Sequence, residues 1–197
     1  MTLDLTPPVA ELTRIVSGVR DDQLDSPTPN TGRDVAALLA HVHGLAIAFR
    51  DAANKIEGPT TSTAPTDDDL QLSEDWRAAI PQRLAELADA WQTPEAWDGM
   101  TQAGGISMPG AITGLVANNE VVLHGWDLAK ATGQPYEVVP ENLQASWQMV
   151  YDTPDSPAEE REGLFGPRLP VPDDAPLLER TLAYAGRDPH WRPTLEG

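Results

Sequence analysis

The chain has 197 residues, of which 40% are hydrophobic and 22% charged, a composition typical of one globular domain with a sizeable core. A single domain over residues 1–197 is therefore expected. With 31 acidic residues against 13 basic ones, the formal net charge is −18, which would repel a nucleic-acid backbone and gain nothing at an anionic membrane surface. These numbers argue against nucleic acid and membranes as partners.

The chain contains no cysteine, which excludes disulfides and thiolate metal ligands. Any thiol chemistry must therefore use a thiol that a cofactor or substrate brings. No apolar run approaches the roughly 18 residues of a membrane span, and the first residues lack the pattern of a signal peptide. We expect the protein in the cytoplasm.

Two helices are predicted in the first third of the chain. Apolar residues recur at helical spacing from Pro7 to Asp21, after a proline pair suited to a helix start. A turn-rich stretch then interrupts the pattern. Thr31, followed three residues later by Asp34, resembles a capping box, and a long amphipathic pattern extends from there to Ile56.

The middle of the chain is predicted to contain a loop, a helix and an undecided segment. Residues 57–69 are small, polar and acidic, and indicate a solvated loop. A third helix is expected from Ser73 to Trp91, with Pro81 marking a kink or a later start. Residues 93–110 are rich in turn formers, and periodicity does not decide whether they hold a short strand or an extended passage.

The fourth helix is the best defined, beginning within residues 108–111 and ending at Gly133. A fifth helix is expected from Pro140 to Tyr151, then a proline-rich excursion over residues 153–176, and a short last helix over residues 177–186. The pattern predicts an all-α fold, most simply four long helices in an antiparallel bundle with a C-terminal elaboration of helix and loop.

The most informative residues are Glu120 and His124 on the fourth helix. Four residues apart on a helix, their side chains point the same way and lie about 6 Å apart along the axis. They share a stripe with residues expected to face the core, where polar groups need partners. The pair can either satisfy itself by a hydrogen bond or, with a group from a facing helix, ligate a divalent cation. Taken alone, such a pair is more often a solvated pair or a core contact.

Two histidines on the second helix compete as the third ligand. His41 lies beside Leu38 and Leu45 at the flank of the apolar arc, and His43 differs from it by only about 20° in distance from the centre of that arc. We favour His41 slightly, although periodicity alone does not settle the choice. Two imidazoles and one carboxylate would leave a coordination position for water, a thiolate or substrate. Zinc is the first choice, but nickel, iron(II), cobalt or manganese would accept the same ligands.

Asp127 lies three residues beyond His124 and points the same way, so it is a candidate to orient a ligand or to handle protons. A structural hydrogen bond is the simpler interpretation of this side chain. One of the arginines could also reach the cavity to hold a substrate carboxylate, although the sequence does not indicate which.

At three segments the chain resembles a known family. These are RDVAALLAHVHG on the second helix, NNEVVLHGWDLAKATG on the fourth, and a tail that begins GLFGPRLPVPDD. In this order they resemble the DinB-like metal-binding four-helix proteins, in the actinobacterial branch that includes mycothiol-dependent maleylpyruvate isomerase and related thiol S-transferases. The tail is similar to that of the stand-alone metal-binding subgroup. The similarity extends over nearly the whole chain.

The resemblance implies that His41, rather than His43, binds the metal together with Glu120 and His124. It implies a cytoplasmic enzyme in which the metal activates the thiol of mycothiol to attack an electrophilic small molecule, as a thiol transferase or related isomerase. The isomerases carry an additional C-terminal domain, and this chain is too short to hold one. A metal-dependent hydrolase or lyase that uses water, and a non-catalytic protein that binds metal or a small molecule, are the alternatives. A homodimer is left open.

Overall fold

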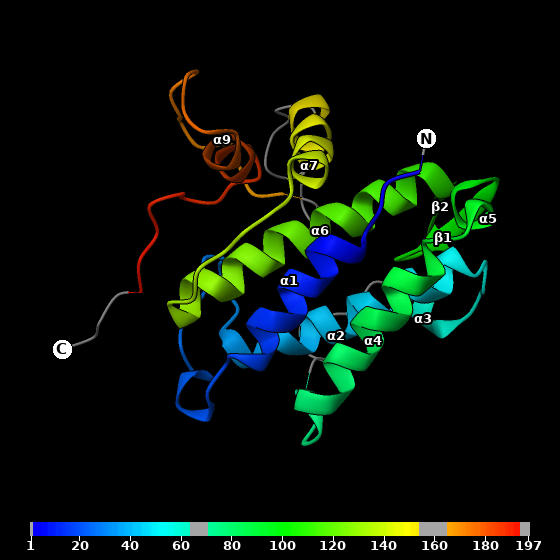
Figure 1. The fold of residues 1–197 in the computed structure, drawn as a ribbon, viewed down its shortest axis with the longest axis horizontal. Coiled ribbons are helices and arrows are strands. Elements are labelled where there is room, and N and C mark those ends of the chain that lie inside the picture. The colour runs from blue at the N-terminus through cyan, green and yellow to red at the C-terminus, as the bar shows by residue number, and fades with distance from the viewer. Residues whose placement is uncertain (1, 64–70, 154–164, 194–197) are drawn as a thin grey trace.

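The computed structural model describes residues 2–63, 71–153 and 165–193, and within them the protein is mostly helical (Figure 1). The helices and strands, in chain order, are α1 (Thr6–Ser17), the 3-10 turn η1 (Asp21–Gln23), α2 (Val35–Ala53), α3 (Pro59–Ser62), α4 (Trp76–Ala90), α5 (Pro94–Trp97), β1 (Met100–Ala103), β2 (Ile106–Pro109), α6 (Gly110–Thr132), α7 (Pro140–Asp152) and α9 (Leu177–Tyr184). The all-α fold expected from the sequence is confirmed.

Helices α1, α2, α4 and α6 form the bundle, in which α1 packs on α4 and α6, and α2 packs on the same two helices. Helices α1 and α6 run one way along the bundle, whereas α2 and α4 run the other way (Figure 1). The predicted antiparallel packing therefore holds between α1 and α4 and between α2 and α6. The neighbours α2 and α4 are parallel, so the chain between them must return along the bundle.

Helix α2 is the apolar centre of this bundle. By length and composition alone, Val35–Ala53 is apolar enough to cross a membrane, contrary to the expectation from the sequence. In the structure more than half of its most apolar stretch is buried, and the helix packs against α4 and α6. Burial in the core of the bundle accounts for its composition.

The ends of the helices follow local chemistry. Helix α2 begins where the Asp34 carboxylate accepts a hydrogen bond from the backbone N–H of Ala37 at 2.7 Å. Asp34 is therefore the N-cap itself, not the far residue of a capping box that starts at Thr31. Helix α6 ends at Gly133, whose positive φ of 69° lets its backbone N–H reach the last carbonyls of the helix.

Several boundaries differ from the expected ones. Helix α1 ends at Ser17 rather than Asp21, and α4 begins at Trp76 and continues through Pro81. The segment left undecided over residues 93–110 contains the short helix α5 and an antiparallel hairpin of β1 and β2. Strands of four residues are too short for their alternation to be recognised in the sequence. The predicted loop over residues 57–69 holds the single helical turn α3 and continues outside the described residues.

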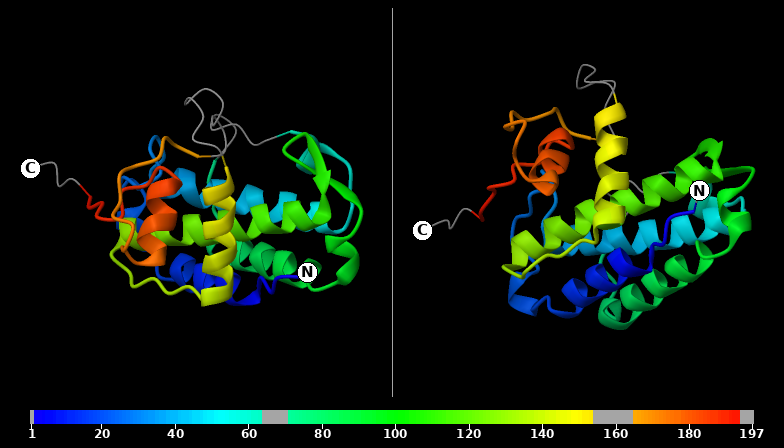
Figure 2. Two further views of the ribbon diagram at one scale, coloured as in Figure 1. Left: turned by 90° about the horizontal axis from the view of Figure 1, so that it is seen from above. Right: turned by 45° about the horizontal axis from the view of Figure 1, so that its top comes forward.

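The C-terminal part of the chain covers α6 on the side away from the bundle. Helix α7 packs on α6, and α9 packs on α7 (Figure 2). A second apolar cluster joins them, formed by Leu123, Trp126, Trp147, Val150, Phe165, Leu182 and Ala185. Helix α6 is thus enclosed from both sides, which explains why residues around most of its circumference are buried.

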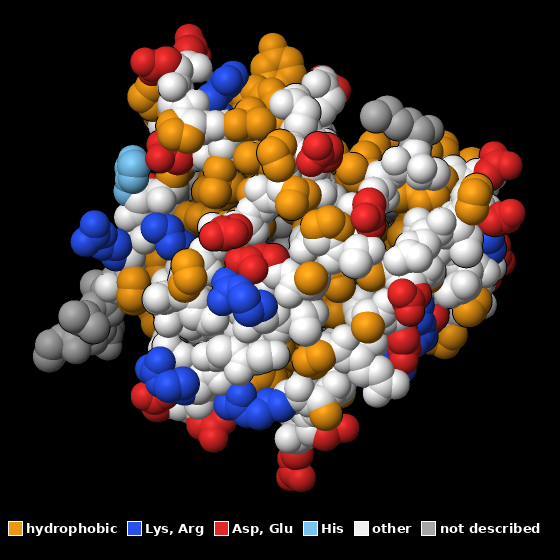
Figure 3. All heavy atoms as spheres, in the orientation of Figure 1, with side chains coloured by type: hydrophobic (Ala, Val, Ile, Leu, Met, Phe, Trp, Pro, Cys, Tyr) orange, Lys and Arg blue, Asp and Glu red, His pale blue; other side chains and the backbone are white. Residues whose placement is uncertain are grey.

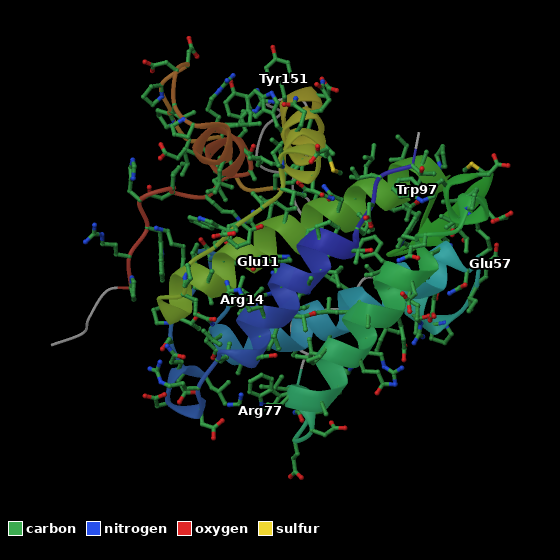
Figure 4. The ribbon with its side chains drawn as sticks, viewed as in Figure 1. Glu11, Arg14, Glu57, Arg77, Trp97 and Tyr151 are labelled. Atoms are coloured by element: carbon green, nitrogen blue, oxygen red, sulfur yellow. The ribbon has the colours of Figure 1, made fainter. Side chains whose placement is uncertain are left out.

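The loop after α6 is fastened to α1. The Arg14 guanidinium pairs with the Glu11 carboxylate at 2.7 Å and also donates to the carbonyl of Pro135 at 2.7 Å. Glu11, which lies beside Arg14 on α1 (Figure 4), in turn accepts a hydrogen bond from the backbone N–H of Glu137. The Arg14 guanidinium, more than any other cause, lowers the pKa of the Glu11 carboxyl. These contacts fix the path of the chain from the bundle to α7.

Candidate metal centre

Helix α6 brings Glu120 and His124 together, as their spacing predicts. His124 Nε2 lies 2.9 Å from Glu120 Oε2. The His124 side chain is 5% exposed, whereas that of Glu120 is 22% exposed. The pair therefore sits at the edge of the core, with the carboxylate on the more open side.

Helix α2 contributes His41 from across the bundle. The His41 and His124 rings meet edge to face, with centroids 5.1 Å apart and planes at 86°. One ligand atom from each of His41, Glu120 and His124 can be chosen so that all three lie within 4.8 Å of one another. Residues 79 positions apart in the chain thus meet at one point, because α2 and α6 are neighbours in the bundle.

His43, the competing histidine, faces a different part of the molecule. It is half-buried, and burial lowers the pKa of its imidazole. The charge of Arg83 lowers that pKa further, and Asp75 opposes the shift. These neighbours belong to α4 and to the residue before it, so His43 lies at the packing of α2 on α4 rather than beside Glu120.

Asp127 lies behind His124. Its carboxylate oxygen Oδ2 is 3.1 Å from His124 Nδ1, so the two ring nitrogens of His124 face two different carboxylates. Burial alone would lower the pKa of His124, but the hydrogen bonds to Asp127 and Glu120 outweigh it and raise that pKa. Asp127 is fully buried and fixes the orientation of the imidazole ring.

Arg187 completes this chain of contacts, and sequence reasoning did not single it out. Its Nε and Nη2 atoms lie 2.9–3.1 Å from the oxygens of Asp127, and its Nη1 donates to the carbonyl of Ala185. The guanidinium is buried with 9% of the residue exposed. Burial would raise the pKa of Asp127, but the charge of Arg187 and the hydrogen bond of His124 bring it below its usual range.

A glycine pair positions Arg187. Gly186 follows α9 with a φ of +80°, and a Cβ atom there would lie 2.6 Å from the Cα of Gly166. Only glycine permits both the left-handed backbone and this close approach. The turn directs the next residue, Arg187, toward α6. The motif AGRDP at the end of the short helix is the sequence signal that could have indicated this turn.

The space beside these residues is small. Toward the bundle axis Glu120 and His124 border an apolar cavity of only about 10 Å³, the size of a single water site. A substrate cannot fit there. The Glu120 side chain is nevertheless 22% exposed, so the site is not sealed from solvent.

The fold and these residues define a class: a helical bundle in which two histidines and a glutamate from facing helices converge at the edge of the core. Residues 5–129, more than half of the chain, match the family of the mycothiol maleylpyruvate isomerase N-terminal domain. The chain belongs to this family.

The chain is also similar to curated relatives and to solved structures. Uncharacterised proteins from two strains of Mycobacterium tuberculosis are each 27% identical over 178 residues, which is 88% of this chain and 90% of the relative. Crystal structures of a mycothiol-dependent maleylpyruvate isomerase and its H52A mutant superimpose with TM-scores of 0.56 and 0.59, at 19% and 18% identity. The match covers 74% of this chain and 66% of the isomerase, just under two thirds. At this identity the structures establish a shared fold.

Proposed function

We propose that this protein is a cytoplasmic metal-dependent enzyme that transfers a thiol of the mycothiol type to an electrophilic small molecule, as an S-transferase or related isomerase. One observation carries the proposal: ligand atoms of His41, Glu120 and His124 lie within 4.8 Å of one another, and the Glu120 side chain is 22% exposed. Membership of the mycothiol maleylpyruvate isomerase family supports the thiol as cosubstrate.

The donor set fits a divalent cation. Two imidazoles and one carboxylate form a common three-ligand site for zinc, and the same atoms suit nickel, cobalt, iron(II) or manganese. Three protein ligands leave a coordination position for an external group. A divalent cation bound by these residues would lower the pKa of a thiol that coordinates it and would so supply a thiolate at neutral pH.

The chain's own residues prepare this site. The Asp127 carboxylate accepts a hydrogen bond from His124 Nδ1–H, and in the neutral ring this leaves Nε2, on the side of Glu120, without a proton and able to bind a cation. Arg187 holds Asp127 as a carboxylate, because its charge lowers the pKa of that group. We assign Asp127 and Arg187 to positioning His124 rather than to contact with substrate.

The composition agrees with an external thiol. No cysteine is present anywhere in the sequence, so the protein has no nucleophilic sulfur of its own. The apolar cavity that Glu120 and His124 border is too small for a reactant, so thiol and electrophile would have to arrive where the Glu120 side chain is exposed. Water would have the same access, which makes a metal-dependent hydrolase or lyase the second candidate.

The decisive experiment measures metal content in protein purified without a histidine tag. We expect about one equivalent of metal in the natural sequence and more than tenfold weaker retention in His41→Ala, Glu120→Ala and His124→Ala. His43→Ala is the matched control, because it removes an imidazole two residues away that faces α4. Circular dichroism should report unchanged helicity. Stoichiometric metal in all three variants would reject the ligand assignment.

The role of the thiol is tested with cobalt in place of the native metal. Addition of mycothiol to the cobalt protein should produce a sulfur-to-cobalt charge-transfer absorption in the near ultraviolet. The control variant His43→Ala should show the same absorption as the natural sequence. If mycothiol leaves the spectrum unchanged while metal is retained, the thiol assignment fails and the hydrolase alternative gains.

A further inference from the structure

A second hollow of the molecule lies on the far side of α6 from the bundle core. It has a volume of about 1550 Å³ and is bounded by residues 2–7, the N-terminal half of α6 and one face of α7. Figure 3 shows hydrophobic side chains gathered on this part of the surface, with acidic side chains beside them. Neither the metal centre nor the proposed reaction uses this groove.

The floor of the groove is apolar and open to solvent. Ile112 and Leu115 contribute from α6, and Leu143 and Met149 contribute from α7. Ile112 is 48% exposed, and Val139 at the entrance to α7 is 36% exposed. A cluster of exposed apolar side chains of this extent is typical of an interaction surface.

The charged residues that line the groove are all acidic. Asp4, Glu141 and Asp152 are exposed at its rim, and no basic side chain is among its described lining residues. Glu141 and Asp152 stand at opposite ends of α7, about 16 Å apart at 1.5 Å per residue. The rim therefore attracts positive charge at two points about three helical turns apart.

Size and charge select the occupant. The volume of about 1550 Å³ exceeds the roughly 300–1,000 Å³ of a small-molecule pocket. A second copy of this chain would bring acidic rims together in a protein of net charge −18. The chain's own segment 154–164 contains four acidic residues and one arginine, so its charge does not match either. The features fit a partner that is both apolar and basic.

We propose that this groove binds an amphipathic basic helix of a partner protein, about three to four turns long. The apolar face of that helix lies on Ile112, Leu115 and Leu143, and its lysine or arginine side chains pair with Glu141 and Asp152. This is the helix-in-groove mode of recognition, in which apolar anchors supply affinity and rim charges supply orientation.

The test uses fluorescence anisotropy with a labelled model peptide of about 14 residues, built from leucine and lysine in amphipathic order. The comparison peptide has glutamate in place of lysine. We expect the lysine peptide to bind and the glutamate peptide not to bind. Glu141→Lys with Asp152→Lys should weaken binding by about tenfold. Asp25→Lys with Glu57→Lys changes the net charge equally at exposed sites outside the groove and should change affinity less than twofold.

The apolar floor has its own matched pair. Ile112→Ser alters a groove residue that is 48% exposed, and Ile56→Ser alters one outside the groove that is 49% exposed. Only Ile112→Ser should weaken binding of the lysine peptide. Circular dichroism confirms that each variant is folded. Equal losses in the groove and control variants, absence of binding, or a dimer in sedimentation velocity that Ile112→Ser dissociates would each overturn the proposal.

Discussion

Removal of Arg187 tests the chain of contacts behind the metal centre. In Arg187→Met the Asp127 carboxylate, which is fully buried, loses three nitrogen–oxygen contacts of 2.9–3.1 Å. A buried pair that loses one partner costs about 3–5 kcal/mol, whereas loss of an exposed pair costs about 0–1 kcal/mol. Since His124 remains a partner of Asp127, we expect a loss near the lower value, about 3 kcal/mol.

Urea denaturation followed by circular dichroism measures this loss. The double variant Asp127→Asn with Arg187→Met removes the unpaired charge, so it should be more stable than Arg187→Met alone by about 1 kcal/mol or more. A cost below about 1 kcal/mol for Arg187→Met would refute the reasoning, because it would place the pair among exposed ones. A double variant less stable than the single one would refute it as well.

The ion pair of Asp127 and Arg187 also predicts that the stability of the fold depends on pH. The pKa of Asp127 is lower in the folded protein than in the unfolded chain, chiefly because the charge of Arg187 outweighs the effect of burial. The ionised carboxylate therefore contributes its full stability above the unfolded aspartate pKa of about 3.9, and this contribution is lost as the pH falls through the lower folded pKa. The stability advantage over the double variant should shrink below about pH 4.

Two further substitutions test the packing around α6. Gly114→Ala places a Cβ atom 2.6 Å from the ring of Trp97 and 2.8 Å from that of Trp91, so it should cost about 1–3 kcal/mol in urea denaturation; an unchanged midpoint would mean that the rings move freely. Tyr136→Phe removes the 2.7 Å hydrogen bond to the carbonyl of Val122 and should cost about 1 kcal/mol. Because burial raises the pKa of Tyr136 above the usual tyrosine value of about 10, this residue should not share in the tyrosinate absorbance that exposed tyrosines develop around that pH. Ultraviolet difference spectra should therefore titrate alike before and after the substitution.

The helices could be predicted because burial imposes a helical period on apolar residues. Helix α6 is the clearest case: both its end at Gly133 and the shared face of Glu120 and His124 follow from spacing and backbone preference. The short strands β1 and β2 could not be predicted from the sequence, because four residues do not establish an alternation of apolar and polar positions.

The choice between His41 and His43 could not be made from periodicity. Two residues on one helix that flank the apolar arc differ only in which neighbouring helix they meet, and that depends on the arrangement of the bundle. His43 meets α4, and His41 meets α6. The role of Arg187 could not be predicted from the sequence for a related reason. Its contact with Asp127 joins positions 60 residues apart, and no spacing rule extends that far.

The parallel course of α2 and α4 also governs how the protein reaches its native state. Adjacent helices here are not joined by short turns, so the bundle cannot be assembled from independent hairpins, and its contact order is higher than that of a simple up-and-down bundle. His41 and Glu120 meet only after chain segments distant in sequence have docked. Binding of a cation by His41, Glu120 and His124 would therefore report that α2 and α6 have docked, since no fragment that lacks either helix contains all three residues.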